Sequence, residues 1–357
     1  MYFDLYLPFP MPYDAEEGGS KKNKKGKWKA IPASTSTTLT SARKVDCWDG
    51  LESRDKDGFA RRVALSGHLG FSVVGCTITP GEPSNQVCPC PFQQSLPFPN
   101  LDPRSCLHQS GAGSSSGSPP LLQVSRYHMR LDDNRVHPLT SQNTSALRNY
   151  DILSVAPTGE KAFQLACTDM ANPGPNQISI ITLPLHERPF TFRFNRKQMR
   201  QAQRNGVVFE LLYSPALFPS PSLPSDVARR YRQNFLSNAR EVVRITGGKG
   251  VILSSGPGGN ENGLRGALDV VNLGTMIGMP ANLAKEAVEK APRLLLLRAQ
   301  ARRTFKAVMS MPRIVPVPGM VDDEGKEDPI VSSSPAKRAA ESIEQKPDVK
   351  KTKKEAV

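Results

Sequence analysis

The chain lacks the marks of a membrane protein and of a secreted, disulfide-bonded one. No apolar run approaches the roughly 18 residues that a membrane-spanning helix needs. The first residues carry an acid at position 4 and several prolines where a signal peptide needs an apolar segment, so we expect no secretory leader. Six cysteines in 357 residues, without such a leader, indicate reduced thiols rather than a disulfide framework.

Histidine is also scarce, which argues against one class of metal enzyme. The chain has five histidines, and none of them forms a His-x-His or His-x-x-Glu-His spacing. Metal-dependent phosphoesterases with barrel folds need several His, Asp and Glu side chains to hold two or three divalent ions. We therefore expect no catalytic residue, no metal site and no cofactor in this chain.

Apolar residues make up only 38% of the chain, while proline (32) and glycine (27) are abundant. This composition predicts a globular core interrupted by insertions that cannot bury apolar surface. We expect disorder at about 10–50 and 80–120, and in a charged tail at 313–357. The formal net charge of +14 favours a polyanionic partner, and nucleic acid fits better than a membrane surface.

The ordered part alternates strands with helices. Seven apolar segments are typical of strands, and the clearest, GVVFELLYSP at 206–215, is apolar on both faces, as parallel strands are. Helical patterns fall between them and after the last one. Such alternation predicts one α/β domain at 1–312, a TIM-like (β/α) barrel of about seven parallel strands. The predicted strands are 2–7, 71–79, 121–133, 151–158, 177–185, 206–215 and 249–256.

Asp4 and Glu210 are carboxylates that stand among apolar residues inside two of these strands. A carboxylate in an apolar strand is either catalytic or held by partners, because an unpaired buried charge is costly. We favour a structural polar network. Arg265 and Asp269, which flank a helix start after the last predicted strand, are the candidate partners.

Five strings in order resemble one family. They are MYFDLYLP at the start, HLGFSVVG (68–75), DILSVAPTGEKAFQLACTD (151–169), NGVVFELLYSP (205–215), and GVILSSG followed by LRGALDVVNLG (264–274). Together they resemble the TIM-barrel-like protein subunit shared by nuclear ribonuclease P and ribonuclease MRP. The family's fold is similar to that of the polymerase-and-histidinol-phosphatase class of metal-dependent phosphoesterases. There the first strand ends in His-x-His, whereas this chain has Asp4-Leu5-Tyr6.

The resemblance implies a non-catalytic subunit of an RNA-based endonuclease. Such a subunit binds and stabilises the catalytic RNA that removes the 5′ leader from precursor tRNA, and the MRP particle processes precursor rRNA. The implied partners are ribonuclease P RNA, MRP RNA and other protein subunits, especially a small α/β subunit, with precursor tRNA contacted indirectly. The implied location is the nucleus, in the nucleolus. Two alternatives stay open: a phosphoesterase with a divergent site, and an RNA-binding barrel outside this particle.

Basic clusters are the candidate RNA contacts. In the predicted helix at 195–206, arginines recur at every fourth position and therefore share one face, with no acid between 193 and 206. A second cluster opens the helix at 225–246, and Arg298, Arg302, Arg303 and Lys306 form a third stretch. The RNA-binding candidates are Arg193, Arg196, Lys197, Arg200, Arg204, Arg229, Arg230 and Arg232.

Two further groups lie in the low-complexity segments. Cys88, Cys90, Cys106 and His108 are zinc-ligand types, but their setting favours incidental thiols in a disordered insertion. The tail holds basic pairs typical of nuclear import signals. The import candidates are Lys337, Arg338, Lys350, Lys351, Lys353 and Lys354.

Overall fold

The computed structural model describes residues 1–11, 47–48, 50–81, 85–105, 119–134, 136–187, 193–219, 223–257 and 261–304. All of them belong to one compact unit, Met1–Met311. Most of the predicted insertion at about 10–50 and the whole tail at 313–357 lie outside the described residues.

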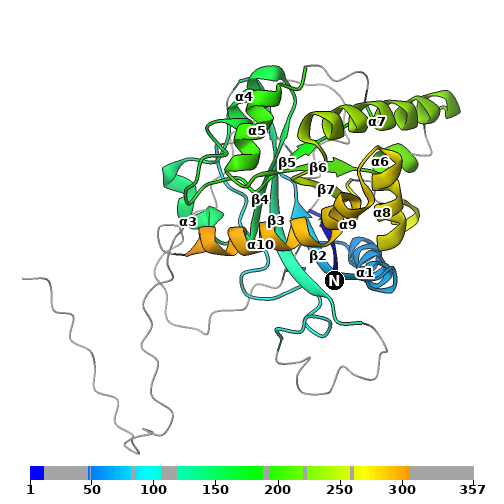
Figure 1. Cartoon of the computed structure of the whole chain (residues 1–357). Helices are drawn as coiled ribbons and strands as arrows, with labels where there is room; N and C mark the ends of the chain where they lie inside the picture. Colours follow the sequence, from blue (N-terminus) through cyan, green and yellow to red (C-terminus); the bar gives the residue numbers. More distant parts are fainter. Residues whose placement is uncertain are drawn as a thin grey trace, which may run out of the picture. The chain divides into compact units, whose positions relative to one another are not determined.

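Seven parallel strands form one sheet in which each strand pairs with the next one along the chain. The sheet curls into a nearly closed barrel (Figure 1), so the TIM-like α/β architecture predicted from the alternation is confirmed. The strands are β1 (Tyr2–Pro8), β2 (Phe71–Ile78), β3 (Leu122–Leu131), β4 (Ile152–Pro157), β5 (Ile180–Leu183), β6 (Val208–Leu212) and β7 (Val251–Ser254).

Helices connect the strands and pack on the outside of the sheet, because parallel strands need crossover connections. Among the described helices, none combines the length and apolarity needed to cross a membrane. The helical elements are α1 (Ser53–His68), η2 (Ser141–Asn143), α3 (Thr144–Leu147), α4 (Glu160–Cys167), α5 (Arg196–Arg204), α6 (Ser214–Leu217), α7 (Ser225–Thr246), η3 (Glu261–Gly263), α8 (Ala267–Met276), α9 (Ala281–Val288) and α10 (Lys290–Arg303).

The inside of the barrel is layered. An apolar layer of inward side chains lies at the amino-terminal ends of the strands, and Leu295 of α10 packs against it. Helix α10 thus covers this end of the barrel (Figure 1). Two residues further along several strands, the buried side chain is polar: Arg126 follows Val124, and Glu210 follows Val208. Because successive side chains alternate between faces, this step of two keeps the polar residues inside the barrel.

Within the described residues, six ladders join the seven strands, and a few hydrogen bonds, most of them involving side chains, take the place of a seventh ladder between β7 and β1. Strands β1 and β7 lie next to each other, but no ladder joins them in the sheet order. Instead the Ser255 amide donates to Asp4 Oδ1 at 3.1 Å, and the Ser255 hydroxyl donates to the Tyr6 carbonyl at 2.7 Å. Asp4 also accepts the Tyr6 amide at 3.2 Å. Asp4 is therefore part of the seam that completes the barrel.

Residues 85–105 correct the expectation of a disordered insertion at about 80–120. Phe92 and Phe98 join an aromatic cluster with Phe9, Trp48 and Phe59. The Phe98 backbone exchanges two hydrogen bonds with the Gln123 side chain. Two phenylalanines and a few backbone hydrogen bonds thus anchor this proline-rich segment. Its overall composition predicted disorder because composition does not show such individual anchoring residues. Residues 82–84 and 106–118 lie outside the described part.

Candidate nucleic-acid interface

Arg126 and Glu210 form a fully buried ion pair across the barrel interior. The Arg126 Nη1 and Nη2 atoms donate to the two Glu210 carboxylate oxygens at 2.7 and 2.5 Å. The same guanidinium donates to the Leu5 carbonyl at 2.7 Å, Thr182 Oγ1 at 3.0 Å and Ser154 Oγ at 2.8 Å. A guanidinium has five N–H donors, so every donor has an acceptor. This saturation offsets the large cost of burying both charges.

Aromatic side chains surround the pair. The Tyr6 ring lies 4.6 Å from the Arg126 guanidinium carbon, in a cation–π contact. His128 meets Tyr6 edge-on at 5.0 Å, and its Nδ1 lies 2.9 Å from Ser154 Oγ. Burial, reinforced by the Arg126 charge, holds the pKa of His128 well below its usual range. The imidazole is therefore neutral at physiological pH.

This interior does not fit the divalent ions that metal-dependent phosphoesterase barrels hold. The carboxylate best placed to ligate a cation, Glu210, gives both oxygens to Arg126. A metal at this point would have to displace a guanidinium with five satisfied hydrogen bonds, or lie beside its positive charge. Among the described residues, no group of three or more His, Cys, Asp or Glu side chains has a metal-binding arrangement.

The hydrogen bonds of Asp4 use only one of its two carboxylate oxygens. Its Oδ2 is buried and has no hydrogen-bond partner among the described residues. Burial raises the pKa of Asp4 to about 6, although the Ser255 and Tyr6 hydrogen bonds oppose this. The nearby Glu210 charge raises the pKa further. The carboxyl is therefore the titrating group of the β1–β7 seam.

The other predicted members of the polar network lie outside the barrel interior. Arg265 donates to the Asn262 and Leu264 carbonyls and stacks on the Phe218 ring. Asp269 is exposed in the first turn of α8. The partner of Glu210 is thus Arg126, and not Arg265 or Asp269.

Helix α5 presents a basic face to solvent. Asn195 caps the helix by accepting the Lys197 amide at 3.0 Å, while Met199 and Ala202 turn toward the core. This orientation leaves the arginines predicted to share a face exposed. Within the described part of the chain, no ion pair involves any of them. The exposed cations are Arg193, Arg196, Lys197, Arg200 and Arg204.

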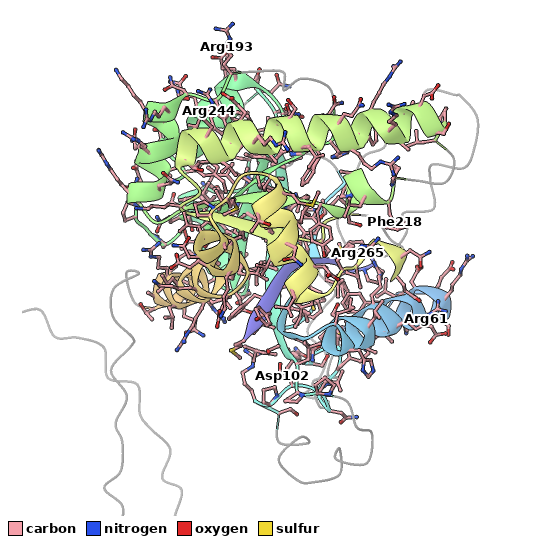
Figure 2. All side chains as sticks on the ribbon, turned by 45° about the vertical axis from the view of Figure 1, so that its right-hand side comes forward. Arg61, Asp102, Arg193, Phe218, Arg244 and Arg265 are labelled. Atoms are coloured by element: carbon pink, nitrogen blue, oxygen red, sulfur yellow. The ribbon has the colours of Figure 1, made fainter. Side chains whose placement is uncertain are left out.

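Helix α7 packs beside α5 and extends the positive surface. Its buried side chains begin only at Phe235, so the first half projects beyond the barrel (Figure 1). Arg229, Arg230 and Arg232 are exposed in this projecting half and have no ion-pair partner among the described residues. Arg244 at the other end is paired with Glu241. Figure 2 shows Arg193 and Arg244 on the same side of the molecule.

The third basic stretch is largely structural. Arg302 is buried and donates to the Tyr150 carbonyl at 2.6 Å, and burial lowers its pKa to about 10. Arg303 pairs with Asp151, and Arg298 donates to the Gly206 carbonyl at 3.0 Å. Arg302 therefore joins α10 to the barrel and is unavailable to a polyanion, while Lys306 lies outside the described residues.

A cavity of about 380 Å³ beside residues 92–104 is less suited to binding a phosphate than the exposed surface of α5 and α7. Its cations are Arg104 and Arg303, and both are already paired, with Asp102 and Asp151 respectively. The excess positive charge of the described surface thus lies on α5 and α7 rather than in this cavity.

The cysteine cluster is only partly described. Cys90 is buried, and burial raises its thiol pKa to about 11, while the Cys88 thiol lies near the Pro89 carbonyl. Cys106, His108 and all six import candidates in the tail lie outside the described residues.

Arg126 is the residue that sequence reasoning missed. It stands in LQVSRYHMRL, where charged residues alternate as they do on a solvated face. One sequence pattern could have indicated that Arg126 is buried. In several strands an inward apolar residue is followed, two positions later, by a polar one, as Val124 is followed by Arg126. The same step occurs in β4, β5, β6 and β7 at Ser154, Thr182, Glu210 and Ser254.

Comparison with known proteins gives consistent matches. A family model described as RNase P subunit p30 matches residues 52–304. The mouse protein named Ribonuclease P protein subunit p30 is 31% identical over 207 residues, which cover 58% of this chain and 70% of the mouse protein. The Saccharomyces cerevisiae protein named Ribonuclease P/MRP protein subunit RPP1 is 27% identical over 183 residues, or 51% of this chain and 55% of that protein.

Solved structures give a weaker likeness. A chain from the cryo-EM structure of archaeal Ribonuclease P with mature tRNA aligns with a TM-score of 0.45 at 11% identity. The alignment covers 74% of this chain and 96% of the archaeal chain.

Proposed function

The chain belongs to the RNase P subunit p30 family, and from this premise we propose that it is a protein subunit of ribonuclease P and ribonuclease MRP. In this proposal it binds and stabilises the RNA of each particle and performs no chemistry itself. The particle removes the 5′ leader from precursor tRNA, and the MRP form processes precursor rRNA. The chain meets precursor tRNA only through the assembled particle.

One observation carries the RNA-binding part of the proposal. The α5 and α7 cations are exposed and have no ion-pair partners among the described residues, whereas the interior cation Arg126 is fully satisfied. Phosphate contacts from lysine and arginine supply most of the affinity of proteins for nucleic acids, and they release counterions. A protein with a formal net charge of +14 and such a surface is suited to an RNA backbone.

The test is the salt dependence of RNA binding. The full chain and its Arg196→Glu/Arg200→Glu variant are titrated with ribonuclease P RNA at several salt concentrations. We expect weaker binding and a salt slope reduced by about 0.7 to 0.9 for each lost phosphate contact. The control is Lys285→Glu/Lys290→Glu, which makes the same change in charge at exposed cations already paired with glutamates. An unchanged slope in the α5 variant refutes this surface as the RNA contact.

The proposal of a particle subunit has a separate test. Affinity purification of the chain from nuclear extract, followed by RNA sequencing, should recover both ribonuclease P RNA and MRP RNA. A small α/β protein should be among the recovered subunits. Recovery of unrelated RNAs alone would favour an RNA-binding barrel outside this particle.

The basic pairs of the tail support a proposal for localisation. We propose that Lys337, Arg338 and the lysines at 350–354 direct import into the nucleus, where the chain assembles in the nucleolus. Deleting 313–357 should reduce nuclear accumulation of a fluorescent fusion. Unchanged accumulation contradicts this role for the tail.

A further inference from the structure

We propose that Phe218 and Arg265 form a stacking site for an unpaired nucleobase of RNA. This inference rests on the proposed RNA-binding function and adds a base contact to the phosphate contacts of α5 and α7. The site lies at the carboxyl-terminal edge of the barrel, where α6 follows β6 and η3 follows β7. Barrels of this kind build their ligand sites at that edge.

Phe218 is an exposed aromatic residue. Its exposed fraction is 42%, whereas the other exposed large apolar residues in the described part of the chain are not aromatic. The residue ends α6, and its amide donates to the Ser214 carbonyl at 2.8 Å. The backbone is therefore held in place while the ring stays accessible, which suits a rigid platform.

Arg265 fixes the ring from one side. Its guanidinium carbon lies 4.5 Å from the centre of the Phe218 ring. Its Nη1 donates to the Leu264 carbonyl at 2.7 Å and the Asn262 carbonyl at 3.0 Å. These bonds anchor the guanidinium, so one ring face is occupied and the exposed area belongs to the rest of the ring. Arginine planes and aromatic rings are the groups on which RNA-binding proteins stack splayed bases.

The charges nearby favour RNA over an apolar protein segment. Helix α6 contacts α7, and Figure 2 shows Phe218 and Arg265 below the projecting half of α7. That half carries Arg229, Arg230 and Arg232, all exposed and without an ion-pair partner among the described residues. An RNA strand bound there by its phosphates would bring its bases to the Phe218 ring.

The experiment combines crosslinking with affinity. The full chain is bound to a short single-stranded RNA that carries 5-iodouridine, a photoreactive base that crosslinks to aromatic side chains on which it stacks. Mass spectrometry should find the crosslink at Phe218. Phe218→Leu keeps apolar bulk against Arg265 but removes the aromatic face, so it should weaken binding about 5- to 150-fold. The salt slope should not change, because stacking releases no counterions, and Phe218→Trp should restore binding.

The control is Leu268→Ala on the neighbouring helix α8, which alters an apolar side chain that is 64% exposed and should leave affinity unchanged. Equal affinity of wild type and Phe218→Leu, or a crosslink elsewhere, overturns the stacking site. If Phe218→Leu leaves RNA affinity intact and releases a protein subunit from the particle, the surface docks protein instead. If Arg196→Glu/Arg200→Glu weakens binding and Phe218→Leu does not, only the stacking site fails. If the wild-type chain has no RNA affinity, both proposals fail.

Discussion

Replacing Glu210 by glutamine should strongly destabilise the barrel without affecting any bound metal. Glu210 accepts two of the five Arg126 hydrogen bonds and also accepts the Thr182 hydroxyl at 2.7 Å. In the variant an amide donor faces the guanidinium, and the Arg126 charge is left buried without a counter-ion. Breaking a buried ion pair in this way costs about 3 to 5 kcal/mol.

The loss is a large part of the free energy of unfolding, which is about 5 to 15 kcal/mol for a folded domain. With a urea dependence of about 2 to 3 kcal/mol per molar, a loss of ~4 kcal/mol lowers the midpoint by about 1 to 2 M. Urea unfolding of the full chain, followed by far-ultraviolet circular dichroism, measures this shift.

A double variant provides the control. Arg126→Met/Glu210→Leu removes both charges, and apolar replacement of a whole buried pair is far better tolerated than loss of one partner. We expect the double variant to lose less stability than the sum of the single variants, by about 2 kcal/mol or more. A Glu210→Gln variant within ~1 kcal/mol of wild type would refute this reasoning. Stoichiometric manganese or zinc that disappears in the variant would instead make Glu210 a metal ligand.

Two further predictions concern the β1–β7 seam and a close approach of β2 to the backbone of β1. Because the pKa of Asp4 is raised from 3.8 to about 6, the folded state binds more protons than the unfolded state between these values. Stability should therefore fall as pH rises from about 4 to 6, by an amount on the order of 3 kcal/mol. Asp4→Asn, which can still accept the Ser255 amide, should remove this pH dependence, and an unchanged stability profile would contradict the assignment. Gly75→Ala should lower the free energy of unfolding by about 1 to 3 kcal/mol. The new Cβ would lie 2.4 Å from the Leu5 carbonyl oxygen, which accepts a hydrogen bond from Arg126. A thermal midpoint equal to wild type would show that β1 can move to make room.

The architecture was accessible from the sequence because it is encoded locally. A strand buried on both faces must be apolar throughout, as at 206–215, and alternation with helices implies parallel pairing. The seven strands lie where the apolar segments predict them, and α5 has the asparagine cap and arginine face that its sequence indicates. The burial of Glu210 also followed from one acid in an apolar run.

The partner of Glu210 could not be found in the same way. Arg126 lies 84 residues away, in a strand where basic residue types occur at every second position, as they do on a solvent-exposed face. Only the curl of the sheet brings β3 opposite β6 and turns Arg126 toward Glu210.

In helix α10, too, the sequence pattern does not indicate which of two arginines, Arg298 and Arg302, is buried. They are one turn apart in sequence, yet Arg302 is buried among backbone carbonyls while Arg298 is exposed. The order of residues 85–105 likewise depends on distant partners such as Phe59 and Gln123. Local pattern thus determined which segments are strands and helices. Tertiary packing decided which charged side chains are buried and paired inside the barrel and which remain exposed on its surface. The reason is that the cost of burying a charge depends on partners that only the fold brings together.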